Sequence, residues 1–118
     1  MWIINFLKKT FGYLSKDEIK ALAVPRSGKW KKIRMQHLQK NSQCAICGSS
    51  DKVVPHHIIP VHVDPSKELD PNNLISLCES KTFNCHLFFG HLKNWSCYNK
   101  DVEKDVEFWR NKLKNKFK

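Results

Sequence analysis

The sequence predicts a small α+β domain in which two short strands and a helix form the centre, four cysteines hold a structural zinc ion, and helices flank both ends. Three observations carry this prediction. The chain has 118 residues with 41% hydrophobic content, which suits one compact domain that a metal ion helps to stabilise. All five cysteines and five of the six histidines lie between residues 44 and 97. In that segment, helical spacing gives way to short β-prone runs separated by turns.

The charge follows the same three-part division. The net charge of +10 divides into +8 on residues 1–43, −1 on residues 44–97 and +3 on residues 98–118. The centre is near neutral and rich in metal-ligating residues, and both flanks are cationic. This pattern predicts that the flanks bind a polyanion and that the centre carries the reactive residues. The alternative is that lysine only keeps the protein soluble. No apolar run approaches the about 20 residues of a membrane span, and no cleavable leader is recognised, so we expect a cytoplasmic protein.

Two short helices are predicted at the start of the chain. Apolar residues recur at helical spacing from Ile3 to Leu14, and Ser15 with Glu18 has the form of a capping box for a second helix. We expect this extension, residues 1–26, to fold back over the core. The alternative is that it lies on a membrane surface.

A basic helix is predicted next, with Ser27 as its cap. Its apolar face is Trp30, Ile33, His37 and Leu38. A basic helix beside a metal centre can grip phosphates, whereas an ordinary solvated helix face is the alternative. The residues that we expect to contact phosphate are Arg26, Lys29, Lys31, Lys32 and Arg34.

A second basic helix is predicted within residues 98–118, capped by Asn99. Its apolar stripe is Val102, Val106, Trp109 and Leu113. Acidic residues in its first turn and lysines near its end suit the helix dipole. Structure alone therefore explains much of this charge order.

The segment between these helices predicts the order strand, long loop, strand, helix. Residues 53–59 are β-prone, and residues 74–77 form a second strand after a polar stretch. Asn84 then has the character of a cap for a helix that carries the last two histidines.

Four cysteines are candidates for a structural zinc site. They are Cys44, Cys47, Cys78 and Cys85. The first pair has the spacing of a knuckle, and the second pair can complete a tetrahedral set with no open position, so that zinc binding would drive folding. The second pair departs from the usual spacing, because the six residues 79–84 separate its members. Free thiols or redox chemistry are the alternatives, and Cys97 is left over.

Two adjacent histidines are the other candidate site. His56 and His57 are neighbours on a predicted strand, so their side chains point to opposite faces. One can therefore bind metal while the other accepts a proton from water near neutral pH. A divalent ion can stabilise the charge that grows on a phosphate.

These residues carry a resemblance to a known family. Residues 27–97 resemble the HNH nuclease motif, small phage-type HNH endonucleases in particular, through HHIIP at 56–60, NLISLC at 73–78 and CH at 85–86, with the knuckle upstream. The resemblance implies a ββα-metal core. It also implies metal-dependent hydrolysis of DNA that leaves 5′-phosphate and 3′-hydroxyl ends. We therefore expect one nuclease domain with a core at 27–97 between an N-terminal extension and a C-terminal helix.

The resemblance assigns a role to each site residue. His57 falls where the family has its general base. His56 falls at the preceding metal ligand, which many members fill with Asp and the colicin nucleases with His. Asn73 matches the asparagine that ties down the loop and orients the base, and His86 matches the last metal ligand.

The implied active-site ion is Mg²⁺ or a similar divalent cation. His91 can join His86 around it only if Gly90 distorts the helix, because five residues along an α-helix rotate about 140°. The sequence offers no obvious carboxylate ligand, and imidazole also accepts Mn²⁺, Ni²⁺ or Zn²⁺. The role of His62 stays open, with core packing and a phosphate contact as the two alternatives.

The expected partner is duplex DNA with weak sequence preference, because phosphate contacts do not read bases. A non-catalytic zinc-stabilised DNA-binding or adaptor module stays open as an alternative. An accessory nuclease that cuts only with a phage packaging partner is another, with the host cytoplasm as its location. One active site per chain handles one strand at a time, so double-strand cleavage would need either two chains, as in a homodimer, or two visits by one chain.

Overall fold

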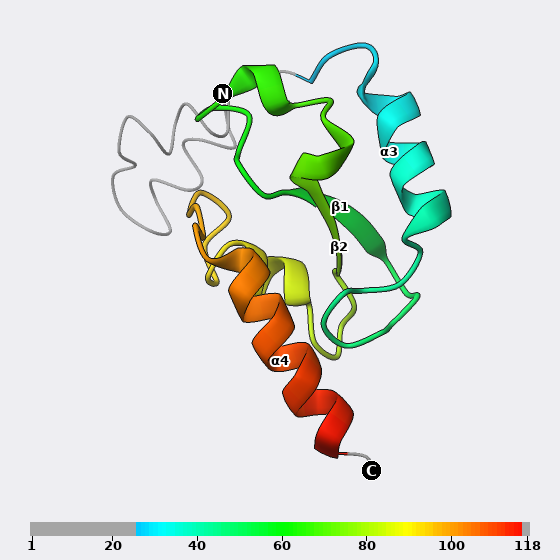
Figure 1. Cartoon of the computed structure of the whole chain (residues 1–118), viewed down its shortest axis with the longest axis vertical. Helices are drawn as coiled ribbons and strands as arrows, with labels where there is room; N and C mark the ends of the chain where they lie inside the picture. Colours follow the sequence, from blue (N-terminus) through cyan, green and yellow to red (C-terminus); the bar gives the residue numbers. More distant parts are fainter. Residues whose placement is uncertain (1–25, 117–118) are drawn as a thin grey trace.

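A computed structural model describes residues 26–116 of the chain, so both helices predicted before residue 26 lie outside the described residues. Its described part is a small α+β structure around one two-stranded antiparallel sheet, as predicted. Helices lie on opposite sides of this sheet (Figure 1). The elements in chain order are α3 (Trp30–Lys40), β1 (Val53–His57), β2 (Leu74–Cys78), the π-helix η3 (His86–Gly90) and α4 (Val102–Lys116), with two 3₁₀ turns, η1 (Pro65–Lys67) and η2 (Pro71–Asn73), between the strands.

The register of the sheet places the two adjacent histidines at the end where β1 ends and β2 begins. His56 pairs with Ile75 and His57 with Leu74. Neighbouring side chains on a strand point to opposite faces, so His56 faces η3 while His57 faces α3. The strand ends at His57, two residues earlier than predicted, because β2 starts at Leu74 and offers no further strand residue to pair with.

The hydrophobic core lies between the sheet, the cysteine knuckle, η3 and α4. Leu77 and Val102 are fully buried, and Ile46 and Val106 are nearly so. The other buried members of this core are Cys44, Cys78 and Cys85. A core with so few large side chains is typical of small domains that depend on a metal ion for stability.

Helix α3 is attached to the sheet by two side chains. It begins at Trp30, because Ser27 forms a turn before the helix in which its carbonyl accepts a hydrogen bond from the Trp30 N–H at 3.0 Å. None of its residues is fully buried. The Trp30 ring packs against His57, and His37 Nε2 hydrogen-bonds Ser76 Oγ at 2.8 Å. The predicted apolar face is therefore half-buried rather than part of the core.

Helix α4 closes the other side of the core. The predicted cap, Asn99, is not the residue that caps it: Asp101 directly precedes the helix and its carbonyl accepts a hydrogen bond from the Asp105 N–H at 2.9 Å. Asn99 instead forms a turn before the helix, in which its Oδ1 accepts a hydrogen bond from the Asp101 N–H at 3.0 Å. Two residues of the predicted stripe, Val102 and Val106, are buried, whereas Trp109 packs on Phe89 at the margin of the core. Within residues 26–116, no helix combines the length and the apolar character needed to cross a bilayer.

Candidate functional site

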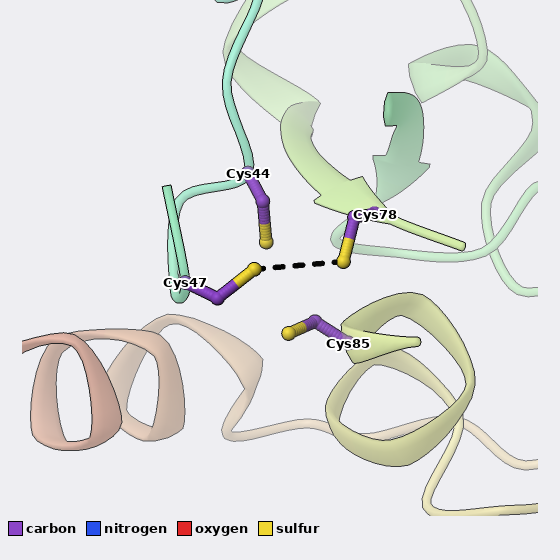
Figure 2. Close-up of side chains that lie close together, drawn as sticks. All are labelled: Cys44, Cys47, Cys78 and Cys85. Atoms are coloured by element: carbon purple, nitrogen blue, oxygen red, sulfur yellow. Dashed lines mark hydrogen bonds between the residues drawn. The ribbon is translucent and has the colours of Figure 1, made fainter. Parts of the chain in front are cut away.

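Four cysteine sulfurs gather where the knuckle, the end of β2 and the start of η3 meet (Figure 2). The sulfurs of Cys44, Cys47, Cys78 and Cys85 all lie within 4.8 Å of one another. The sulfurs of Cys47 and Cys78 are 3.6 Å apart. Two thiolates bound at about 2.3 Å to a tetrahedral zinc ion are about 3.8 Å apart. The cluster can therefore hold zinc.

Backbone turns bring the two cysteine pairs together. Gly48 has φ +76°, a conformation that glycine adopts without strain, and its N–H donates to the Cys44 carbonyl at 3.0 Å. The six residues between Cys78 and Cys85 form a closed turn, in which the Asn84 N–H donates to the Ser80 carbonyl at 3.0 Å. The long spacing is thus compatible with one four-sulfur cluster.

The four thiols differ in how readily they ionise, because they are buried together and hydrogen-bond one another. A hydrogen bond from Cys85 lowers the pKa of Cys44 to about 4. That same hydrogen bond raises the pKa of Cys85, and burial raises the pKa of Cys47 to about 11. Although burial opposes the shift, hydrogen bonds, that of Ser80 among them, lower the pKa of Cys78. Two of the four thiols therefore ionise more readily than the other two, and a bound cation would favour ionisation of all four.

Three histidines form a second cluster. His56 ends β1 with its neighbour, His86 opens η3, and His91 directly follows that helix. Each offers a ring nitrogen, and these nitrogens lie within 4.8 Å of one another. The Nε2 atoms of His86 and His91 are 3.2 Å apart. We call these three residues the histidine triad.

Hydrogen bonds fix the tautomers of two triad members. His86 Nδ1 contacts Glu79 Oε2 at 2.8 Å, and His91 Nδ1 contacts the Cys97 carbonyl at 3.0 Å. A carboxylate and a carbonyl can only accept, so both Nδ1 atoms carry the proton and both Nε2 atoms present lone pairs. Two nitrogens bound at about 2.0–2.1 Å to one tetrahedral ion are about 3.3 Å apart. This donor set therefore fits a divalent ion.

Burial keeps the triad in the neutral form that binds metal. It is the main cause that lowers the pKa of His56 to about 2 and that of His91 to about 4, and the neighbouring imidazoles add to both shifts. Burial also lowers the pKa of His86, although the Glu79 carboxylate opposes that shift. All three rings are consequently unprotonated at neutral pH and available as ligands.

His57 lies on the other face of the strand in a different environment. Its ring packs on Trp30 with centroids 4.7 Å apart, and its Nε2 contacts the Glu68 carbonyl at 2.8 Å. Because a carbonyl only accepts, Nε2 carries the proton and Nδ1 is the basic atom. Burial lowers the pKa of His57, so this base is unprotonated at neutral pH.

Asn73 closes the loop that supplies this carbonyl. Its Oδ1 accepts from the Ile59 N–H at 2.8 Å, and its Nδ2 donates to the carbonyls of Ile59 at 2.9 Å and Lys67 at 3.1 Å. Asn73 is buried, and its side-chain hydrogen bonds go to Ile59 and Lys67 rather than to His57. Asn73 is linked to His57 indirectly: it hydrogen-bonds Lys67, the next residue is Glu68, and the Glu68 carbonyl hydrogen-bonds the His57 ring.

Comparison with known protein families gives a match over the segment that contains the cysteine cluster and the two strands. Residues 44–87 match the family model described as HNH endonuclease. This segment is similar to an HNH endonuclease domain, and we refer to it as the HNH domain. The match confirms the family predicted from the motifs, and it includes the four cysteines, both strands and His86. Searches of the curated proteins and of the solved structures found no match.

The HNH domain supports a nuclease-type function, and HNH domains use divalent metals. A cavity of about 260 Å³ joins the two histidine environments, because the triad and His57 all line it. Trp95 lines the same cavity and packs against the rings of His86 and His91, with centroids 4.9 and 5.2 Å away. The three clustered histidines and His57 thus share one cavity of the HNH domain.

The structure separates the five basic residues predicted to contact phosphate. Arg26 lines the cavity of the HNH domain and lies 5.8 Å from the Trp30 ring. Lys31 and Lys32 line a separate shallow surface on α3. Lys29 is exposed before that helix, and Arg34 is half-buried within it. Of the five, Arg26 is the one beside the histidines.

Two supporting residues of the HNH domain were absent from the sequence prediction. Glu79 holds His86, and the Glu68 carbonyl holds His57. The position of Glu79 directly after a predicted zinc ligand was a usable signal for its proximity. A backbone carbonyl leaves no signal in the sequence, so the role of Glu68 could not have been found.

The π-helix explains how His91 joins His86. An α-helix would turn these residues about 140° away from each other. The wider turn of the π-helix His86–Gly90, with hydrogen bonds between residues five apart, brings His91, which directly follows it, back toward the side of His86. Gly90 lies inside this turn, where an added Cβ would be 3.1 Å from His56 Nδ1 and 3.1 Å from His86 Cδ2. Glycine is needed here because two triad rings approach the backbone closely.

We expect Gly90→Ala to lower the metal affinity and the activity of the HNH domain by about 10-fold or more, because small misplacements of a catalytic group are costly. The added methyl must displace the rings of His56 or His86. Metal titration and a cleavage assay check this result. Gly28→Ala is the matched control, since nothing lies within 4 Å of a Cβ at Gly28. Equal loss in both variants would contradict the explanation.

Proposed function

We propose that the chain is a metal-dependent endonuclease that hydrolyses DNA phosphodiester bonds. The observation that carries this proposal is the division of work between adjacent histidines that line one cavity. His56 joins two other imidazoles in a set that fits a divalent ion. His57 is held by a carbonyl through one nitrogen, so its other nitrogen is basic. A binding module would need neither arrangement.

His57 acts as the general base. Its Nδ1 accepts a proton from the attacking water, and the Glu68 carbonyl then stabilises the imidazolium through the Nε2–H. The low pKa that burial gives His57 keeps the ring ready for this step at neutral pH. Attack on phosphorus with departure of the 3′ oxygen leaves a 5′-phosphate and a 3′-hydroxyl end.

The histidine triad would hold the active-site ion. When bound, this ion supplies electrostatic stabilisation of the charge that develops on the phosphate and its leaving oxygen. Three imidazoles favour a transition-metal ion such as Ni²⁺ or Zn²⁺ over Mg²⁺, which prefers oxygen ligands, and they also accept Mn²⁺. The four cysteines would hold a separate structural zinc ion.

The DNA backbone is the proposed partner of the cationic residues around this site. Arg26 lies at the cavity and is placed to contact a phosphate next to the scissile one. Lysines on α3 contribute attraction that is independent of sequence. Binding should therefore weaken steeply with salt and show little preference among sequences.

Cleavage of supercoiled plasmid by the purified chain tests this function. We expect nicked or linear products with a divalent ion, their suppression by EDTA added in the reaction, and their return with excess Mn²⁺ or Mg²⁺. Zinc content is measured on the same sample, so that loss of the structural ion is not mistaken for loss of the active-site ion. A folded, zinc-loaded chain that leaves the plasmid supercoiled with every ion tested would contradict the proposal.

A further inference from the structure

We propose that Glu79 is a positioning residue that fixes the ring of His86 and strengthens it as a metal ligand, so that this carboxylate sets the metal affinity of the histidine triad. The inference rests on the proposed function, since it concerns the metal site of the same reaction. Glu79 is a carboxylate near the metal site that the sequence analysis did not identify. It hydrogen-bonds a metal ligand, His86, and is not itself a ligand.

The contact between the two side chains is specific. Glu79 Oε2 accepts a hydrogen bond from His86 Nδ1 at 2.8 Å. The His86 side chain is 14% exposed and the Glu79 side chain 38% exposed, so the bond is partly shielded from water. Among the described residues, no lysine or arginine lies within ion-pair distance of Glu79. The charge of its carboxylate is therefore directed at the His86 ring.

The backbone of Glu79 is held on both sides. Its N–H donates to the Lys52 carbonyl at 2.8 Å. It lies between Cys78, which is fully buried, and Ser80, which is 6% exposed. The residue after the other cysteine of this pair is His86 itself. The four-sulfur cluster therefore positions both ends of the Glu79–His86 hydrogen bond.

A carboxylate partner has a larger effect on a metal-binding imidazole than a neutral one. It holds the proton on Nδ1, orients Nε2 toward the ion and raises the basicity of that nitrogen. His91 obtains the same tautomer from the neutral carbonyl of Cys97. Loss of such a supporting partner lowers metal affinity by about 10–100-fold. His86 is the triad member for which a side-chain substitution can test this effect.

Three variants separate the contributions of charge and hydrogen bonding. Glu79→Gln keeps an acceptor for the Nδ1–H but removes the charge, whereas Glu79→Ala removes both. Glu107→Gln is the matched control, because this substitution removes the same charge at an exposed position on α4, 16 residues after His91 in the sequence. Each zinc-loaded chain is titrated with Ni²⁺ by calorimetry, and ¹⁵N NMR of the imidazoles reports the tautomer of His86.

We expect the Kd for Ni²⁺ to rise about 10–100-fold in Glu79→Ala and by less in Glu79→Gln, with no change in Glu107→Gln. The Nδ1–H signature of His86 should persist in Glu79→Gln and be lost in Glu79→Ala. Parent-like affinity and tautomer in Glu79→Ala would overturn the inference, as would loss of structural zinc in that variant. A parent chain that binds no Ni²⁺, with His86→Ala indistinguishable from it, would instead overturn the metal site of the proposed function.

Discussion

Replacing His57 with alanine is expected to lower the rate of plasmid cleavage by about 10²–10⁴-fold, the usual contribution of a general base. The residue lies against Trp30 on the face of β1 opposite the triad, so the loss should fall on the chemical step. The metal affinity of the variant should equal that of the parent, because His57 is not among the three clustered ligands. Rates of plasmid nicking with saturating divalent ion, together with Ni²⁺ titration, check both statements.

The neighbouring substitution His56→Ala is the matched comparison. It removes a triad ligand, so it should weaken metal binding, and excess ion should recover part of its activity. Excess ion should not recover His57→Ala. If His57→Ala cut as fast as the parent, or if both variants lost metal equally, the assignment of separate roles to the two histidines would be wrong.

Replacing Cys85 with serine is expected to abolish the folded state at ordinary temperatures. Cys85 is almost fully buried in the core and belongs to the four-sulfur cluster. In small zinc domains the apparent binding free energy of zinc is about 10–16 kcal/mol, which is as large as the about 5–15 kcal/mol of net stability of a typical domain. Zinc content should fall well below one ion per chain, and the cooperative thermal transition should disappear from circular dichroism.

Cys97→Ser is the control for this experiment. Cys97 is the fifth cysteine and lies outside the cluster. It serves His91 through its backbone carbonyl rather than through its thiol, so the serine variant should keep its zinc and its thermal transition. A Cys85→Ser chain that melts like Cys97→Ser would show that the cluster does not hold a structural ion.

The order of elements, the cysteine cluster and the separation of His56 from His57 could be predicted because they depend on local patterns, whereas the resemblance to HNH nucleases was needed to assign His86 to the metal site. Alternation along β1 separates His56 from His57 whatever the rest of the chain does. The cysteine spacing likewise indicates a shared ion. Both follow from side-chain chemistry at fixed positions along the chain.

Other features of the site could not be predicted because they depend on tertiary contacts. Gly90 indicates that the helix at residues 86–90 can be distorted, but the sequence does not specify a π-helix, because the close approach of two imidazoles to Gly90 is a tertiary contact. The packing of Trp30 on His57 brings together residues 27 positions apart. Helical periodicity places Trp30 on an apolar face, as the structure also does, but it does not specify His57 as the residue that Trp30 contacts.

One consequence of the cysteine positions concerns how this domain can change. Cys78 is followed immediately by Glu79, and Cys85 by His86, so a single peptide bond separates the sulfur cluster from each partner of the Glu79–His86 hydrogen bond. An inserted or deleted residue at either bond would rotate one group out of place while leaving the other fixed. Any transplant of this site into another protein must therefore carry residues 78–86 as an uninterrupted block.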